Sequence, residues 1–298
     1  MTDTRETFAY FPGCLAGESA REYDASIRWL AREVGVELRE IDDWNCCGAG
    51  VVQDLDPQAG RALAGRNLAL AGGRKVLSGC PNCVTCLQEA GSRDSASHVL
   101  GLFTRADIRE KIAARIKATK EKRPVGSLKV ACFYSCELSK PEVWALGGEP
   151  VERPIELLME IAGATVVKWG GMMRCSGGYM LLAKPELGFD LLAKTFRDFE
   201  SSGADAIVTA CPHSHFNLDS FQYTLGKKRK SALEVPVLHF TEVLALAMCA
   251  ESAGADRWLD RHVASTFPLI ERLVAEEEKR KAAEARAQKK SAREKDKP

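Results

Sequence analysis

The stretch Trp44-Asn45-Cys46-Cys47-Gly48 carries two adjacent cysteines, and Met173-Arg174-Cys175-Ser176-Gly177 repeats it later with serine as the second member of the pair. Each pair is preceded by a single cysteine, Cys14 or Cys136, and is followed by a Cys-Pro step. The single cysteine and the pair are 32 positions apart in the first half (14 to 46) and 39 in the second (136 to 175). The sequence is therefore an internal repeat with an intact first copy and an eroded second copy.

Each cysteine motif follows a short apolar run that is typical of a buried strand, and segments of helical period lie between these runs. The runs are 7–10, 36–41, 74–77 and 98–102 in the first half and 129–132, 164–169, 206–209 and 235–239 in the second. The helical segments include 23–34, 59–70, 155–161 and 187–199. This alternation predicts an α/β fold of two pseudo-repeated, Rossmann-like domains with parallel sheets, at 1–120 and 128–265. A charged tail at 275–298 is expected to be helical or disordered.

The cysteines of the first half all follow predicted strands. In open parallel sheets, the loops after the strands line one crevice, where ligands usually bind. We therefore expect this crevice to collect five thiols, those of Cys14, Cys46, Cys47, Cys80 and Cys83. Gly13, Gly48 and Gly79 beside them would allow tight turns and close approach of the backbone to a bulky cofactor.

Five thiolates favour an iron–sulfur cluster over a structural zinc ion. Zinc is satisfied by four ligands, and the adjacent side chains of Cys46 and Cys47 diverge, so both can bind only something larger than one ion. Iron–sulfur clusters are held by thiolates and offer several metal atoms. Cys86 extends Cys80 and Cys83 into the start of a ferredoxin motif, but Ala90 and Gly91 stand where that motif needs cysteine and proline. We interpret Cys86 as helix packing.

The second half retains three of the five thiols, Cys136, Cys175 and Cys211, and has Ser176 and Ser214 in the other two places. Serine oxygen is a poor replacement for thiolate on soft iron–sulfur sites. His213 is a possible fourth ligand, as histidine is in Rieske centres, although a polar residue lining an open crevice is the alternative. Ser176, Ser214 and His239 are candidates for a substrate crevice, and His239 could equally be a buried structural histidine.

Composition excludes several classes of function. The 298 residues carry a net charge of +1, which offers no field for nucleic acid or membrane surfaces. The apolar runs are too short to cross a bilayer, and the polar start shows no secretory signal. Eleven cysteines without such a signal favour metal or redox chemistry over disulfides. We expect a cytoplasmic protein that neither binds nucleic acid nor inserts into membranes.

The two cysteine motifs and their spacing resemble the family of heterodisulfide reductase B subunits, whose hallmark is a doubled cysteine-rich "CCG" domain. The likeness runs from Tyr10-Phe11-Pro12-Gly13-Cys14, through the Cys-Cys-Gly pair, to Val237-Leu238-His239-Phe240-Thr241. It implies a noncubane [4Fe-4S] cluster in the first half, held by Cys14, Cys46, Cys47, Cys80 and Cys83. The second half departs from the pattern and is expected to hold a smaller cluster or none.

In this family the clusters cleave or form disulfides, with electrons passing through two partners, a ferredoxin-like C subunit and a flavoprotein A subunit. Serines in the second motif favour the heterodisulfide reductase-like complexes of sulfur-oxidising organisms, which work on sulfur bound to a lipoate-carrying protein. The resemblance thus implies an oxidoreductase component that acts on a sulfur group within a complex. The alternatives are an electron-relay component, as in lactate- and glycolate-oxidising systems, and a structural metal-binding scaffold.

Overall fold

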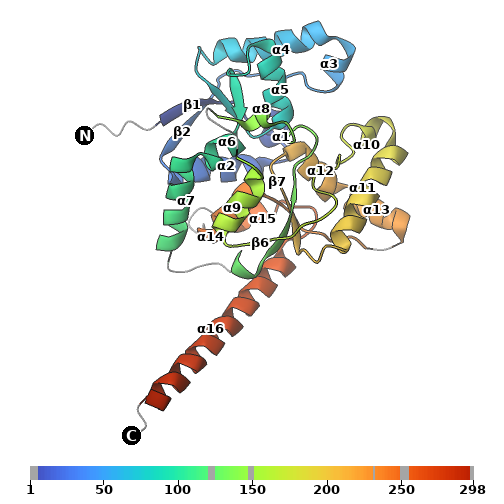
Figure 1. Ribbon diagram of the computed structural model, residues 1–298. Helices are drawn as coiled ribbons and strands as arrows, with labels where there is room; N and C mark the ends of the chain where they lie inside the picture. Colours follow the sequence, from blue (N-terminus) through green and yellow to red (C-terminus); the bar gives the residue numbers. More distant parts are fainter. Residues whose placement is uncertain (1–5, 120–124, 147–150, 231, 249–254, 296–298) are drawn as a thin grey trace, which may run out of the picture.

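The computed structural model describes residues 6–119, 125–146, 151–230, 232–248 and 255–295. Strands and helices alternate along these ranges (Figure 1). The strands are β1 (Glu6–Tyr10), β2 (Val36–Glu40), β3 (Val76–Ser78), β4 (Ala96–His98), β5 (Lys129–Phe133), β6 (Thr165–Val166), β7 (Ala206–Thr209) and β8 (Val237–His239). The helices of the first half are α1 (Gly13–Gly17), α2 (Arg21–Glu33), α3 (Val51–Leu55), α4 (Pro57–Leu70), α5 (Pro81–Ala90), α6 (Val99–Thr104) and α7 (Ala106–Ala118).

The second half repeats this succession. Its helices are the 3₁₀ turn η1 (Val125–Ser127), α8 (Pro141–Trp144), α9 (Pro154–Ala162), α10 (Met180–Ala183), α11 (Pro185–Glu200), α12 (Pro212–Ser220), α13 (Gln222–Arg229), α14 (Phe240–Ala247), α15 (Ala255–Leu259) and α16 (Phe267–Lys295). Cys249 lies outside the described residues.

Two four-stranded sheets carry the repeat, with strand orders β2-β1-β3-β4 and β6-β5-β7-β8. Every strand pair in both is parallel. The predicted α/β fold with two parallel sheets is therefore confirmed. In each order the chain moves to one side of the first strand and then to the other. This reversal places the topological switch point, where the crevice of an open sheet lies, between β1 and β3 and between β5 and β7.

The predicted strand 98–102 is wrong over most of its length. Strand β4 ends at His98, and the following residues form α6, whose members are all buried. The His98 ring starts this helix by accepting a hydrogen bond from the Leu100 amide at 3.1 Å. A short, wholly apolar run does not distinguish a buried strand from a buried helix. The predicted strand 164–169 is likewise reduced to the two residues of β6.

The two halves share their largest hydrophobic core. Helix α14 of the second half packs on α2 of the first and on α9, and apolar side chains of both halves form one buried cluster around them. Smaller clusters fill the outer face of each sheet. The halves are thus joined through a common interior, and the cysteine loops lie along its edge.

Helix α16 leaves the body of the molecule and projects away from it (Figure 1). Only its start is anchored, by the buried side chains of Leu269 and Leu273 and by the Arg272–Asp205 ion pair at 2.7 Å. The charged tail predicted at 275–298 is therefore helical as far as Lys295, and its helix begins earlier, at Phe267. Among the residues that the structure describes, no helix has the length and apolar character needed to cross a membrane.

Candidate metal centre

Three loops bring the cysteines of the first half together. Cys14 lies in α1 directly after β1, and Cys80 directly follows β3, the neighbouring strand. The two thus flank the switch point. Cys46 and Cys47 lie in the loop after β2, and Cys83 lies in the first turn of α5. The strand-end convergence expected from the sequence is present in the structure.

The five thiols form a connected group. The Cys46 thiol is hydrogen-bonded to both Cys14 and Cys47, and the sulfur atoms of Cys47 and Cys83 are 3.3 Å apart. Cys83 is in turn hydrogen-bonded to Cys80. None of the ten described cysteines forms a disulfide, and Cys14 and Cys46 are the exposed members of the group. The group is therefore closed on one side by the core and open to solvent at Cys14 and Cys46.

Neighbouring thiols share protons in this group. The hydrogen bond from Cys46 lowers the pKa of Cys14 to about 6, and hydrogen bonds from Cys46 and Cys83 lower the pKa of Cys47. The partners that donate, Cys46 and Cys83, have raised pKa values for the same reason. Because the thiolate is the form that binds metal, the low pKa values mark Cys14 and Cys47 as the thiols that are most easily deprotonated.

Cys86 is part of this group, which the sequence interpretation as plain packing did not foresee. Its thiol is hydrogen-bonded to Cys47 and lies 2.9 Å from the side-chain oxygen of Gln53. Cys80, Cys83 and Cys86 follow one another at intervals of three, which places them near one face of α5. That spacing was the signal for a sixth thiol at the site.

The backbone around the site requires glycine at two positions. Gly13 has φ of +76°, and a Cβ there would lie 3.0 Å from the Cys83 sulfur. Gly48 has φ of +83°, and a Cβ there would lie 3.1 Å from the backbone of Gly60 in α4. Larger residues at these positions would be strained and would intrude on the cysteine loops.

The second half brings together fewer thiols. Cys136 is hydrogen-bonded to Cys175, which raises the pKa of Cys136 and lowers that of Cys175 to about 6. Cys211 is buried, and this burial, together with the nearby Cys80 thiol, raises its pKa to about 11. Cys132 lies in β5 and is buried. The two Cys-Pro cysteines, Cys80 and Cys211, thus approach each other where the halves meet.

The two serines of the eroded motif contact each other. The Ser176 and Ser214 hydroxyl oxygens are 3.2 Å apart, and both residues are buried. The Ser214 amide donates to the Cys211 sulfur at 3.4 Å. The serines therefore occupy the places where two further thiols would complete the set, and they satisfy each other by hydrogen bonding.

His213 lies on the side of the second half that faces Cys14. Its ring packs on Tyr179 at 4.6 Å between ring centroids. Both line a cavity of about 230 Å³ that Cys14 borders. Burial of the phenol, and then the nearby Cys80 and Cys47 thiols, raise the pKa of Tyr179. Sequence reasoning missed Tyr179, which stands three residues after the second member of its pair, as Gly50 does in the first half.

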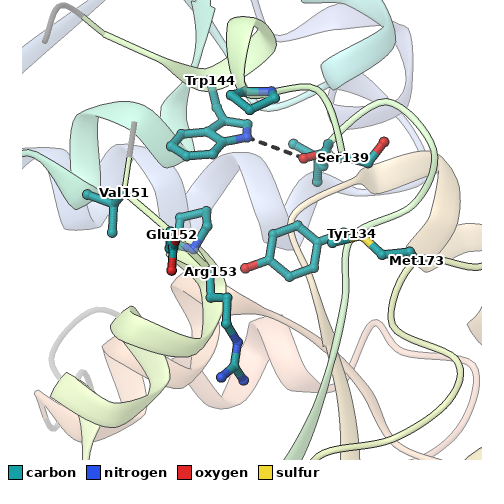
Figure 2. Close-up of a pocket in the computed structure, with 10 residues that line it drawn as sticks. Tyr134, Ser139, Trp144, Val151, Glu152, Arg153 and Met173 are labelled. Atoms are coloured by element: carbon teal, nitrogen blue, oxygen red, sulfur yellow. Dashed lines mark hydrogen bonds between the residues drawn. The ribbon is translucent and has the colours of Figure 1, made fainter. Parts of the chain in front are cut away.

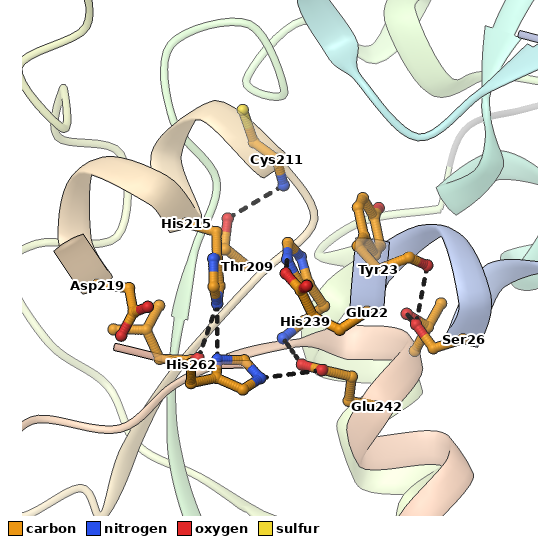
Figure 3. Close-up of polar contacts among 12 residues, drawn as sticks. Glu22, Tyr23, Ser26, Thr209, Cys211, His215, Asp219, His239, Glu242 and His262 are labelled. Atoms are coloured by element: carbon orange, nitrogen blue, oxygen red, sulfur yellow. Dashed lines mark hydrogen bonds and ion pairs between the residues drawn. The ribbon is translucent and has the colours of Figure 1, made fainter. Parts of the chain in front are cut away.

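His239 lies in a buried polar network at the boundary of the halves (Figure 3). Its ring is stacked between Tyr23 (3.9 Å) and His215 (4.1 Å), and neither ring nitrogen has a hydrogen-bond partner. His215 in turn contacts His262 at 3.0 Å, and His262 donates to Glu242 at 3.0 Å. His239 is therefore inside the protein, and its ring is not part of an open crevice surface.

A second cavity, of about 290 Å³, lies beside the Cys136 segment (Figure 2). Tyr134, Trp144, Arg153 and Met173 are among the residues that line it. The Tyr134 hydroxyl donates to Glu156 and accepts from the Ile155 amide at 3.0 Å, and the Trp144 indole donates to the Leu138 carbonyl at 3.2 Å. These polar groups are already paired, and none of the predicted site residues lines this cavity.

The donor set of the first half fits an iron–sulfur cluster better than a single ion. The 3.3 Å contact between Cys47 and Cys83 is short enough for two ligands of one ion. The number of thiols carries the argument, because zinc takes four ligands and this group offers the five predicted thiols and Cys86. Soft thiolates are also the ligands that iron–sulfur clusters use.

Comparison with known proteins agrees with this donor set. The cysteine-rich domain CCG matches the chain twice, at residues 8–88 and 130–219. The 8-methylmenaquinol:fumarate reductase membrane anchor subunit of Wolinella succinogenes is 32% identical over 82% of this chain and 93% of its own length. The B subunit of the ferredoxin/F(420)H(2)-dependent CoB-CoM heterodisulfide reductase of Methanosarcina acetivorans is 27% identical over 80% of this chain and 88% of its own. A protein of Archaeoglobus profundus that is named as similar to the heterodisulfide reductase B subunit is 27% identical over 81% and 90%.

A solved structure shares the fold alone. The crystal structure of a hypothetical protein from Helicobacter pylori superposes with a TM-score of 0.61 at 12% identity. The match covers 87% of this chain and 52% of that protein, so this chain spans about half of its length. The two CCG matches, in contrast, span more than half of the present chain. The protein therefore belongs to the cysteine-rich CCG domain family, together with the heterodisulfide reductase B subunits that resemble it.

Proposed function

We propose that this protein is the iron–sulfur subunit of a heterodisulfide reductase-like oxidoreductase complex. The observation that carries the proposal is the connected group of thiols that three strand-end loops of the first half form. Cys14, Cys46, Cys47, Cys80 and Cys83 would hold a noncubane [4Fe-4S] cluster. Such a cluster supplies one-electron steps next to a sulfur atom of a disulfide or thiol. The relatives are themselves reductase subunits, which supports the class of reaction.

The second half would hold a smaller cluster or none. Its three thiols are accompanied by two hydroxyl groups that already pair with each other. His213, which we expected as a possible fourth ligand, faces Tyr179, so the support for its ligand role is weak. The sulfur-oxidising branch with lipoate-bound sulfur stays our preferred substrate assignment, on the basis of the serine replacements alone.

The protein would work with partner subunits. The names of the relatives describe subunits of larger enzymes. A ferredoxin-like C subunit and a flavoprotein A subunit are the partners that we propose, with a lipoate-carrying protein as a possible substrate donor. The unpaired cysteines suit a reducing compartment and support a cytoplasmic location.

An electron-relay role is the second candidate. The relative from Wolinella succinogenes is named as part of a fumarate reductase that uses a quinol, so its name contains no sulfur substrate. A relay needs the cluster to exchange electrons but does not need an iron atom that is open to a substrate sulfur.

The proposed function is tested by analysis of iron and acid-labile sulfide in anaerobically purified protein. We expect at least four irons per chain and a brown protein. Cys47→Ser should abolish the noncubane spectrum, whereas Cys132→Ser, which changes a buried cysteine in the interior of β5, should leave it intact. Stoichiometric zinc without sulfide would contradict the proposal.

The same preparation separates the two candidates. A substrate-like thiol or lipoyl compound should perturb the paramagnetic signal of the cluster if the site acts on sulfur. If electron exchange is intact and no thiol perturbs the signal, the protein is a relay.

A further inference from the structure

The cavity of about 230 Å³ next to Cys14 lies between the two halves. Cys14 and Leu15 border it from α1, and Tyr179, Leu182 and Phe216 border it from the second half. Its volume is below the roughly 300–1,000 Å³ of pockets that enclose drug-sized molecules, so it suits a short chain or a single small ring. Cys14 is one of the exposed thiols of the N-terminal group. The cavity is therefore a route from solvent to that group.

Tyr179 narrows this route by contacting the first half at Gly50. A Cβ on Gly50 would lie 2.5 Å from the tyrosine ring, so the ring occupies the space that a side chain there would need. The phenol donates to the Ala49 carbonyl at 3.5 Å, and the opposite side of the ring system is supported by His213. Gly50 and Tyr179 occupy equivalent positions in the two copies of the motif, three residues after Cys47 and Ser176. The eroded half thus supplies an aromatic cover for the intact half.

The lining of the cavity sets the kind of molecule that can enter. Leucine and phenylalanine side chains make up half of it, and no lysine or arginine among the described residues lines it. A carboxylate or sulfonate group moved into such surroundings would lose its hydration without gaining a cationic partner, which costs several kcal/mol. An uncharged thiol or disulfide arm loses far less.

From these contacts we propose that Tyr179 is a specificity-determining residue, which restricts access to Cys14 to uncharged, mainly apolar sulfur compounds and excludes anionic ones. The inference rests on the proposed function in so far as it concerns the substrate. The restriction of access itself is a property of the protein without its cofactor and can be measured there.

The test uses two alkylating reagents of nearly equal size, neutral iodoacetamide and anionic iodoacetate, on the reduced, metal-free protein. In both reactions the thiolate attacks the CH₂ carbon, a C–S bond forms and iodide leaves. Rates at Cys14 and at Cys136, the exposed reference thiol of the second half, are read by peptide mass spectrometry. Dividing the neutral-to-anionic ratio at Cys14 by that at Cys136 removes the reactivity of the reagents and the ionisation of each thiol.

We expect the quotient to be about tenfold or more for the natural protein and to fall at least threefold in Tyr179→Ala. Tyr179→Phe keeps the ring and should retain the selectivity. Tyr223→Ala, a change of an exposed tyrosine on α13, is the matched control and should match the natural protein. A quotient near one, or a Tyr179→Ala protein that is as selective as the natural one, would overturn the inference.

A second arm uses iron-loaded protein and compares mercaptoacetamide with mercaptoacetate as perturbants of the paramagnetic signal. The neutral thiol should act at concentrations at least tenfold lower, and Tyr179→Ala should reduce this difference. The two failures are distinguishable. If the protein takes up no iron and sulfide, the proposed function fails while the alkylation result still decides the role of Tyr179. If the cluster forms but Tyr179→Ala changes neither ratio, the inference on Tyr179 fails alone.

Discussion

Ser135 holds the place in the second half that Gly13 holds in the first, immediately before the single cysteine. Both residues have positive φ, +65° for Ser135 and +76° for Gly13. The turn that presents the first cysteine has therefore been retained even where its glycine has not. A non-glycine residue in this region costs roughly 1–2 kcal/mol, and the Ser135 hydroxyl is buried without a hydrogen-bond partner.

We predict that Ser135→Gly stabilises the protein by about 1 kcal/mol. The change relieves the backbone strain and removes an unpaired hydroxyl, and the greater freedom of glycine in the unfolded chain offsets part of the gain. Urea unfolding of the reduced protein measures the difference. Ser139→Gly is the control, because that exposed serine has no positive φ. A Ser135→Gly protein less stable than the natural one would show that the strain is not there.

The serine pair leads to a prediction on iron content. Ser176→Cys together with Ser214→Cys restores five thiols to the second half, and the present 3.2 Å contact between the two hydroxyl groups shows that the two positions converge. We expect the iron and sulfide content to rise by about four atoms each per chain. Ser139→Cys, an added exposed thiol outside the pair, should leave both unchanged. An unchanged iron content in the double variant would mean that more than these two ligands has been lost.

Among the elements, α6 shows what the sequence could and could not predict. Most helices were predictable within a few residues, since α2, α4, α9 and α11 each follow an apolar face of helical period. The segment after β4 was predicted as strand because six consecutive buried residues leave no polar face to reveal the period. Only the packing partner of the segment decides its form, and that partner, α8, is some forty residues further along the chain.

The contact between α6 and α8 depends on Gly101. A Cβ at this position would lie 1.7 Å from the carbonyl oxygen of Trp144, and neither backbone can yield without separating the two helices. We predict that Gly101→Ala destabilises the protein by about 3 kcal/mol or more, in the upper range for single substitutions. Gly126→Ala serves as control, because nothing lies within 4 Å of its added Cβ. Thermal unfolding of both variants checks this, and equal midpoints would contradict it.

For the whole molecule, the sequence could predict the convergence of the cysteines but not the union of the halves. Strand ends of parallel sheets meet at one edge, so Cys14, Cys46 and Cys80 could be placed together from their positions alone. The contacts between the halves join residues such as Tyr23 and Ala210, or Ser26 and Thr241, which are separated by 187 and 215 positions. No local pattern marks such pairs, and the same holds for Tyr179 and Gly50.

The boundary between the halves contains a pH-sensitive group on each side. Burial raises the pKa of Glu22 to about 7 from an ordinary 4.5, with a further contribution from the Glu242 charge. Burial alone would lower the pKa of His262, but the carboxylate of Glu242, its hydrogen-bond partner, raises it to about 9 from 6.5. In both cases the folded protein holds the proton more tightly than the unfolded chain. Each group therefore contributes stability at low pH that is lost as the pH rises to its folded pKa.

The last prediction separates these two groups by their pH windows. Glu22 loses its contribution between about pH 4.5 and 7, because there the folded state must ionise a buried carboxyl group. Glu22→Gln stays neutral, so its stability relative to the natural protein should rise across that window, by an amount of the order of 2 kcal/mol, and stay level above pH 7. His262→Gln should instead alter the slope between about pH 6.5 and 9. Urea unfolding at half-unit steps from pH 4.5 to 9.5 measures both, and a difference between Glu22→Gln and the natural protein that is independent of pH would show that Glu22 is not held neutral at the boundary of the halves.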